Sequence, residues 1–264
     1  MDADADWTRV EDALGLRLPR EFTEIARRYG RGTFCDEFTC RTPEEMAGET
    51  PGRLEDLRLM LQDEGEDCPH PVHPEPGGLL LWASDSVGGA LCWLTEPADS
   101  PEQWKTVYWT RDDGFEYPEG GVAAVLAGLL EDLTPRMGEN GADVDGPWFD
   151  PYRRHVHVYL QLAEAPGAPP YDERLRILRR SLAPTSARGG FQGATGGRQD
   201  HFAAAGGRWT LTYETAYGHQ IRVAYPPGAD ERVRDALLPA IDAMGCRVKG
   251  VLPVHGTAHW PDPE

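Results

Sequence analysis

Apolar positions in the first 133 residues recur at the spacing of an amphipathic helix in several places. Phe22, Ile25, Ala26 and Tyr29 fall at i, i+3, i+4 and i+7, which is one face of a helix over 19–29. Gly30 supplies the left-handed residue that ends this helix. The same period predicts further helices over about 6–14, 53–65 and 122–133.

Strand patterns separate these helices. The segment 32–43 alternates apolar and polar residues, whereas 78–84 is a continuous apolar run of the kind found in a strand covered on both faces. The segment 89–95 follows across the sequence DSVGG, which predicts a hairpin turn. Alternation returns over 104–110, so this half of the chain is predicted to be an α+β domain.

The pattern breaks after residue 133 and then restarts. The segment 134–147 is polar and rich in Gly and Pro, which favours a linker. Beyond it, strands are predicted over 154–164, 208–215, 219–226 and 246–254, with helices over 171–183 and 230–245. The order β-α-β-β-α-β suggests a ferredoxin-like sandwich, a fold that hosts many unrelated functions. We therefore predict a first domain over 1–135, a linker over 136–152, a second α+β domain over 153–254 and a tail over 255–264.

Charge divides the chain in the same way. Residues 1–150 hold 33 acidic against 12 basic side chains, a net charge of −21, whereas residues 151–264 hold 11 against 14, a net of +3. The acidic half is expected to repel nucleic acid and anionic membranes and to attract basic partners. The alternative is that the acidity only aids solubility.

Three further features of the composition bear on the setting. No apolar run approaches the roughly 20 residues that a membrane helix needs. The start MDADADWTRVED is acidic, whereas a signal peptide begins with basic residues. The five cysteines form no C-x-x-C pair and are an odd number, which favours reduced thiols. We expect a cytoplasmic protein; its oligomeric state does not follow from the sequence.

Several stretches of the first half are similar to one family in the order of their elements. VEDALGLRLP followed by EFTEIARRYGRGTF resembles the opening of the SUKH superfamily, the SMI1/KNR4-like proteins. LLLWASDSVGGALCWLT is similar to that family's strand-turn-strand, and WKTVYWTRDDGFEYPEGGVAAVLAGLLEDL to its closing strands and C-terminal helix. The resemblance covers residues 6–133, and residues 150–264 resemble no family that we recognise. Matching motif positions, chiefly structural ones, are Leu18, Pro19, Tyr29 and Gly30.

The resemblance implies a mixed sheet with packed helices and a binding role rather than catalysis. Bacterial SUKH proteins are mostly immunity proteins that neutralise toxins, often nucleases, and other members act as regulatory hubs. The leading hypothesis is a two-domain immunity protein that occludes the active site of a basic toxin, because a nuclease needs Lys and Arg to bind phosphates. The first alternative is a regulatory or scaffold module. The second is an enzyme whose site lies near His155, His157 and His219.

Candidate chemistry in the sequence is sparse. His155 and His157 could share one strand face and hold a metal, but the sequence fixes no third ligand. The Gly-rich segment 187–199 lacks the Lys-Ser/Thr ending of a phosphate loop and is predicted to be a flexible connector. No nucleophile, hydrolase or zinc-protease motif is present. We therefore assign no catalytic, cofactor or metal residues.

Charged runs beside the central strands are the predicted contact surface for a protein partner. Tryptophan is enriched at interface hot spots, and most members of the Trp82, Trp93, Trp104 and Trp109 cluster should instead be core. The alternative for the charged runs is an ordinary solvated surface. The predicted partner-binding residues are Asp63, Glu64, Glu66, Asp67, Asp85, Asp112, Asp113, Glu116 and Trp109.

Overall fold

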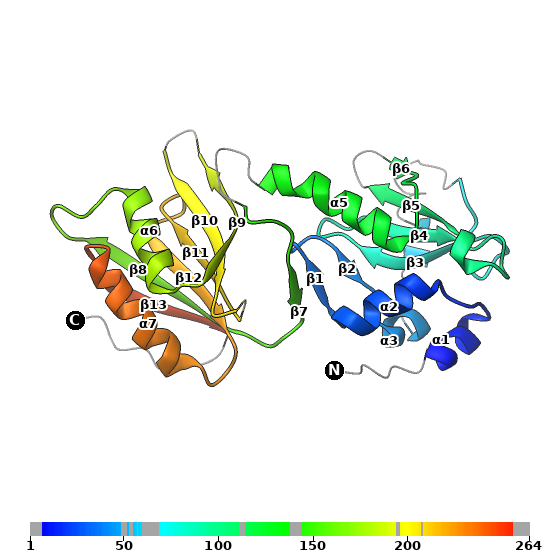
Figure 1. The fold of residues 1–264 in the computed structure, drawn as a ribbon, viewed down its shortest axis with the longest axis horizontal. Coiled ribbons are helices and arrows are strands. Elements are labelled where there is room, and N and C mark those ends of the chain that lie inside the picture. Colours follow the sequence, from blue (N-terminus) through cyan, green and yellow to red (C-terminus); the bar gives the residue numbers. More distant parts are fainter. Residues whose placement is uncertain are drawn as a thin grey trace. The chain divides into compact units, whose positions relative to one another are not determined.

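The computed structural model describes residues 7–48, 52, 55–56, 58–59, 69–110, 114–137, 144–193, 196–206 and 208–255. The chain divides into two compact units. Unit 1 comprises residues 1–132 and 147–152, and unit 2 comprises residues 133–146 and 153–264. Figure 1 shows the elements of both, and the α+β class predicted from the sequence is confirmed.

Unit 1 begins with two short helices that cover a sheet. Helix α1 spans Trp7–Leu14 and helix α2 spans Arg20–Tyr29, close to the predicted bounds. Gly30 ends α2 with φ of 68°, and its N–H donates to the carbonyl of Ala26. In Figure 1, α1, α2 and the short helix α3 (Pro43–Gly48) gather on one side of the strands of this unit.

An aromatic cluster fixes α1 and α2 to the sheet. Phe22 of α2 is fully buried and meets Trp93 edge-on, with ring centroids 5.0 Å apart. It also contacts Trp82 at 6.3 Å and Trp7 of α1 at 5.7 Å, both edge-on. Such pairs contribute roughly 0.5–1.5 kcal/mol each beyond the area that they bury. Helix α2 therefore packs on the sheet and covers its buried tryptophans.

The sheet under these helices has the strand order β2-β3-β4-β5-β6. Its strands are Thr39–Cys40 (β2), Leu79–Ser84 (β3), Ala90–Leu94 (β4), Lys105–Thr110 (β5) and Gly114–Glu116 (β6). All pairings between these strands are antiparallel, whereas the resemblance implied a mixed sheet. A single parallel bridge, from Val72 to Leu79, adjoins β3 among the described residues. Unit 1 also contains a one-turn 3-10 helix (Pro101–Gln103) and helix α5 (Val122–Met137), whose last residues belong to unit 2.

A second, two-stranded sheet uses part of the predicted linker. Strand β7 (Phe149–Pro151) pairs antiparallel with β1 (Gly32–Phe34). Phe149 contacts Phe34 and Tyr29, with ring centroids 4.7 and 5.0 Å away. A Cβ on Gly32 would overlap this strand, so only glycine permits the close pairing. Residues 149–151 therefore belong structurally to unit 1.

The described part of unit 2 is built on one six-stranded antiparallel sheet. The strand order is β13-β8-β12-β11-β10-β9. Helices α6 (Tyr171–Ser181) and α7 (Asp230–Ala243) lie on the same face in Figure 1. Leu178, Val233 and Leu237 of these helices are fully buried in one core with residues of the strands. The strands are Val156–Glu164 (β8), Thr185–Gln192 (β9), Arg198–Ala204 (β10), Trp209–Glu214 (β11), Gln220–Tyr225 (β12) and Cys246–His255 (β13).

Two predictions for unit 2 were wrong. The Gly-rich segment 187–199 is no flexible connector, because most of it lies in β9 and the start of β10. Four strands therefore run between the two helices where the ferredoxin-like order had two. Gly189 and Gly190 pair with His201 and Asp200, so the small residues of β9 lie inside the ladder. The predicted helix over 53–65 lies mostly outside the described residues.

Candidate interaction surfaces

The β3–β4 turn of unit 1 is organised by one carboxylate. Asp85 Oδ1 accepts the N–H groups of Val87 at 3.0 Å and Gly89 at 2.6 Å, which fixes the turn. Its Oδ2 accepts the hydroxyl of Tyr108 at 2.8 Å. A Cβ on Gly89 would overlap Asp85 and lie 2.8 Å from the carbonyl oxygen of Trp109. The turn therefore requires both the carboxylate and the glycine.

Three carboxylates gather around Tyr108, and we call Glu37, Asp85 and Glu116 the acidic turn cluster. Glu37 accepts the hydroxyl of Ser86 at 2.7 Å, which joins the loop before β2 to the turn. Glu116 pairs with Tyr108 across the β5–β6 ladder. Burial raises the pKa of the Tyr108 phenol, and the charges of all three carboxylates raise it further. Tyr108 is therefore neutral at pH 7, and its hydroxyl donates a hydrogen bond to Asp85.

An exposed apolar residue lies at the tip of the same turn. Val87 is 60% exposed, between the exposed Ser86 and Gly88. Asp36, in the adjoining loop, is exposed and has φ of 58°, and Cys35 before it has φ of 53°. The positive φ values bend the loop sharply at this point. The surface thus combines negative charge with one projecting apolar side chain.

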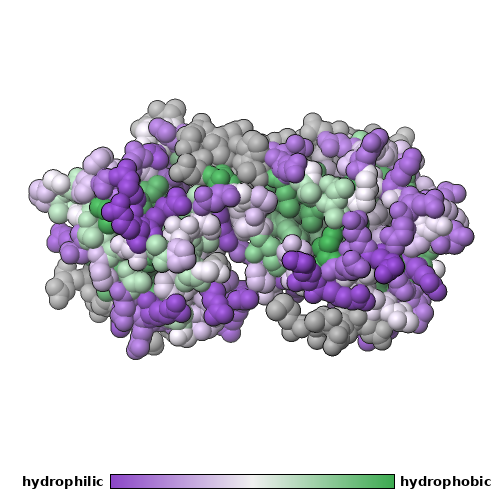
Figure 2. Space-filling view, viewed as in Figure 1, coloured by the Kyte–Doolittle hydropathy of each residue, from purple (hydrophilic) through white to green (hydrophobic). Residues whose placement is uncertain are grey.

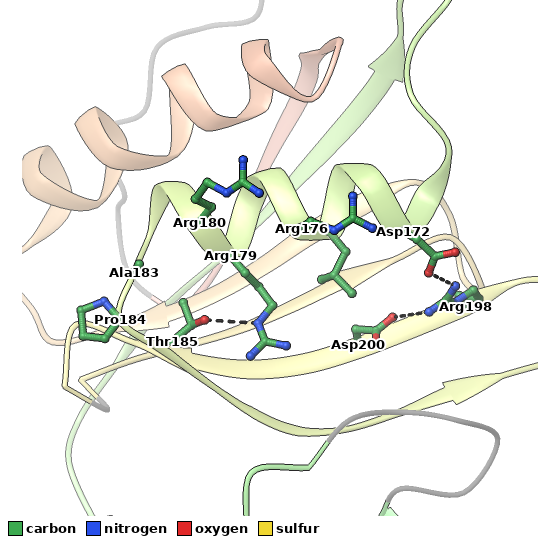
Figure 3. Close-up of a pocket in the computed structure, with 10 residues that line it drawn as sticks. Asp172, Arg176, Arg179, Arg180, Ala183, Pro184, Thr185, Arg198 and Asp200 are labelled. Atoms are coloured by element: carbon green, nitrogen blue, oxygen red, sulfur yellow. Dashed lines mark hydrogen bonds and ion pairs between the residues drawn. The ribbon is translucent and has the colours of Figure 1, made fainter.

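Unit 2 contains a cavity of about 760 Å³ beside α6. Figure 3 shows Arg179 extending from α6 toward Thr185, and Arg198 lying between Asp172 and Asp200. Arg176 and Arg180 project from the other side of the helix in the same view. Leu175, Ala183 and Pro184 complete the lining. Figure 2 shows hydrophilic residues gathered over α6 and over α2.

An ion-pair network around the buried Arg174 of α6 bears on the alternative of an enzyme in unit 2. Arg174 is 6% exposed and pairs with Glu164, and the hydrogen bond from Arg174 lowers the pKa of that carboxyl group. His219 lies with Nδ1 3.4 Å from Glu164 and Nε2 3.0 Å from the hydroxyl of Tyr213. Burial lowers the pKa of His219, with Arg174 adding to the effect. These contacts join α6, the end of β8, Tyr213 of β11 and the residue before β12.

Cys246 lies beside Arg174 and is the nearest candidate nucleophile. Its side chain is 5% exposed, and burial raises the pKa of the thiol despite the nearby guanidinium. A reactive cysteine needs a lowered pKa and access to solvent. The geometry of Cys246 fits a structural thiol, and the site offers no activated nucleophile.

The predicted histidine pair has no metal-binding partner set in the described part of the chain. His157 of β8 is exposed and pairs with Ala224 of β12 across the ladder, and His155 lies just before the strand. Within the described ranges, no group of three or more His, Cys, Asp and Glu side chains is placed to hold a metal ion. Among the same residues, no helix has both the length and the apolar character needed to cross a bilayer.

Comparison with family models gives a match for the N-terminal part of the chain. A family model, SUKH_6, described as SMI1-KNR4 cell-wall, matches residues 4–119. The N-terminal half carries a SUKH domain. The match includes α1, α2 and the strands β1 to β6, whereas the resemblance seen in the sequence extended to residue 133. No curated protein and no solved structure matches the chain, and no family model was found for the C-terminal half.

The SUKH family is associated with immunity proteins, and its domains are generally non-catalytic and bind protein partners. Its motif residues have structural roles in this chain. The Glu11 carboxylate accepts the N–H of Leu18 at 2.9 Å after Gly15 ends α1, and Pro19 precedes α2. The Arg20 N–H at the start of α2 donates to Glu102 at 2.9 Å. The motif thus fixes the angle between the two helices of the SUKH domain.

The structure brings two of the predicted partner-binding residues together and shows that another is buried. Asp85 and Glu116 lie in the acidic turn cluster, and Glu116 is exposed. Trp109 was a wrong choice, because it is 2% exposed and packs in a core cluster with Val107 and Leu81. The other members lie outside the described residues: Asp63, Glu64, Glu66, Asp67, Asp112 and Asp113.

Sequence reasoning missed Glu37 in the SUKH domain. No periodic pattern marks it, since it lies in the tight loop between β1 and β2. The signal was the run CDEF between two short strand patterns, which places a carboxylate next to a predicted turn. The four central tryptophans, by contrast, are all buried, as expected for core residues.

Proposed function

We propose that this chain is a non-catalytic immunity protein whose SUKH domain binds a basic toxin of the nuclease type and covers its active site. The proposal places the protein in the cytoplasm, where such a toxin would act. The observation that carries it is the acidic turn cluster within a SUKH domain. Glu37, Asp85 and Glu116 form a compact negative patch within the half whose net charge is −21.

The cluster has the composition that a protein interface needs. Nuclease active sites carry Lys and Arg to hold phosphates, so a carboxylate patch can occupy the same positions. Opposite charge raises the rate of association, and this effect weakens as salt screens the charges. Val87, at the tip of the turn, supplies an exposed apolar contact beside polar groups. Because Asp85 is held by the turn, its carboxylate is ordered before any partner arrives.

The test first asks whether the open reading frame immediately upstream encodes a toxin domain, and then uses that domain as the binding partner. Association with the purified chain is measured by surface plasmon resonance at two salt concentrations. The double variant Glu37→Gln/Glu116→Gln removes two charges and leaves Asp85 to hold the turn. We expect its association rate to fall about tenfold at low salt, with a smaller difference at high salt.

A matched control removes two exposed charges elsewhere in the same unit. The variant Glu24→Gln/Glu44→Gln changes residues on α2 and α3, away from the turn. It should bind within about twofold of the unchanged chain, apart from the long-range effect of lost net charge. Equal losses in both double variants would place the contact elsewhere, and the absence of a complex at low salt would count against toxin binding.

The second candidate is a regulatory or scaffold module, which the cell-wall wording of the matched family description favours. In that case the SUKH domain would contact a resident protein and unit 2 a second one. Affinity purification separates the two functions. Two results together would favour the scaffold. The chain would recover resident proteins and no toxin, and its gene would have no toxin gene beside it.

A further inference from the structure

The cavity beside α6 in unit 2 is unlike the acidic surface of unit 1, because arginine dominates its lining. Its charged side chains are Arg176, Arg179, Arg180, Arg198, Asp172 and Asp200. The lining therefore has two more positive than negative charges in a chain whose net charge is −18. Glu173, outside the lining, pairs with Arg176, so the positive excess lies at Arg179 and Arg180. A local excess of positive charge in a strongly acidic protein concentrates small anions.

The two aspartates are already engaged at one end of the cavity. Arg198 pairs with Asp172 and lies 3.6 Å from Asp200, while its guanidinium stacks 4.4 Å from the ring centre of Tyr171. The Tyr171 hydroxyl donates to Asp200 at 2.7 Å. This end is a closed network with one net negative charge, since one arginine faces two aspartates. Its carboxylates still have lone pairs that can accept hydrogen bonds from a ligand.

The other end has donors with loose partners. Arg179 Nε donates to the Thr185 hydroxyl at 3.2 Å, and its Nη2 lies 3.7 Å from Asp145, a long ion pair. Asp145 already accepts the N–H of Ala187 at 2.6 Å, and its side chain is 56% exposed. The terminal N–H groups of Arg179 can therefore turn to an oxyanion without leaving a buried charge behind. Arg180, exposed at the rim, has no acidic partner among the described residues.

We propose that this cavity binds a small phosphorylated molecule of about the size of a mononucleotide. The phosphate lies against Arg179 and the Thr185 hydroxyl, because guanidinium groups bind phosphate with paired, charge-assisted hydrogen bonds. Arg180 adds positive potential at the rim, whereas the charge of Arg176 is offset by its ion pair with Glu173. The organic part packs on Leu175 and Pro184, and its hydroxyl or amino groups donate to Asp172 and Asp200. A volume of about 760 Å³ is within the range of small-molecule sites.

The experiment titrates the purified full chain with AMP and with inorganic phosphate by isothermal calorimetry. We expect AMP to bind with a Kd of roughly 10 µM to 1 mM, at least about tenfold tighter than inorganic phosphate, because the organic part adds contacts. Arg179→Gln should weaken AMP binding at least about tenfold and Thr185→Val a few-fold, as expected for charge-assisted and neutral hydrogen bonds. Circular dichroism melting shows that each variant is folded.

Arg247→Gln is the matched control, since it removes an exposed arginine from β13 in the same unit and lies outside the cavity lining. It should bind AMP as the unchanged chain does, and an equal loss would overturn the proposal. No heat from AMP at about 1 mM would overturn it as well. Inorganic phosphate binding as tightly as AMP, or an oligoglutamate peptide binding where AMP does not, would overturn the assignment to a phosphorylated small molecule.

Discussion

Loss of the Arg222 guanidinium should destabilise unit 2 because it leaves a buried carboxylate short of a donor. Glu214 of β11 is completely buried and accepts three hydrogen bonds. The donors are Arg222 Nε at 2.5 Å, Gln220 Nε2 at 2.6 Å and Gln199 Nε2 at 3.0 Å. Arg222→Met keeps much of the apolar stem and removes the guanidinium, whose central carbon lies 5.1 Å from the centre of the Tyr159 ring.

The magnitude follows from the burial of the two partners. Removing one partner of a buried pair costs about 3–5 kcal/mol, because the remaining charge loses its compensation. The Arg222 side chain is 36% exposed, so water can reach the site in the variant, and we reduce the expected loss to about 2–4 kcal/mol. With a urea m value near 2 kcal/mol per molar, the midpoint should fall by about 1–2 M.

The assay follows urea unfolding by circular dichroism together with hydrogen exchange of β11 and β12. Two units can unfold separately, so exchange shows which transition moves. The double variant Glu214→Met/Arg222→Met removes both charges and should recover most of the loss, since no buried charge remains. Arg234→Met, on an exposed pair with Asp235, should change stability by less than about 0.5 kcal/mol. If Arg222→Met is as stable as the unchanged chain, or the two losses simply add, the reasoning is refuted.

Three other predictions concern the packing of Phe22 and the pKa values of His219 and Cys40. Phe22→Ala should lower the stability of unit 1 by about 3–5 kcal/mol, measured by urea unfolding, because it removes the ring that meets both Trp82 and Trp93 edge-on. A loss below about 1 kcal/mol would contradict this packing of α2 on the sheet. The pKa of His219 is lowered by burial, so the unfolded chain takes up a proton first and unit 2 should lose stability as the pH falls below 6.5. Melting curves from pH 8 to 5 test this, and His219→Gln should flatten the dependence. Burial raises the pKa of Cys40 to about 12, so iodoacetamide at pH 8 should label this thiol only after unfolding. Mass spectrometry of the peptide that contains Cys40 measures the labelling. Rapid labelling of the folded chain would contradict the burial of this thiol.

The sequence predicted best those elements whose side-chain pattern is set by burial on one face. Helix α2 and strands β3, β4 and β5 were found at almost their observed bounds, because each contributes a periodic apolar row to one core. Helix α3 was missed although Thr42 and Glu45 form a capping box, with N–H to side-chain distances of 2.8 and 3.3 Å. That signature is local and was present in the sequence.

Other misses had causes that no local pattern shows. Strand β9 contains Gly189 and Gly190, which read as a loop, yet pairing with β10 places them inside a sheet. Strand β7 is only three residues long, and its pairing with β1 joins positions more than 110 residues apart. The acidic turn cluster likewise needs three separate segments to meet at Tyr108, and only two of its three carboxylates were chosen from the sequence.

The return of β7 to unit 1 determines how this protein can be divided. The chain passes from unit 1 to unit 2 near residue 132, returns near 147 and leaves again near 152. One cut in the polar segment 133–146 would therefore leave β7 covalently attached to unit 2 while it remains paired with β1. A truncation ending at residue 135 would strip β7 from β1 and uncover Tyr29 and Phe34. An N-terminal fragment that keeps β7 has to extend through Tyr152. Because residues 147–152 belong to unit 1 and residues 133–146 to unit 2, no single cut in the chain separates the two units completely.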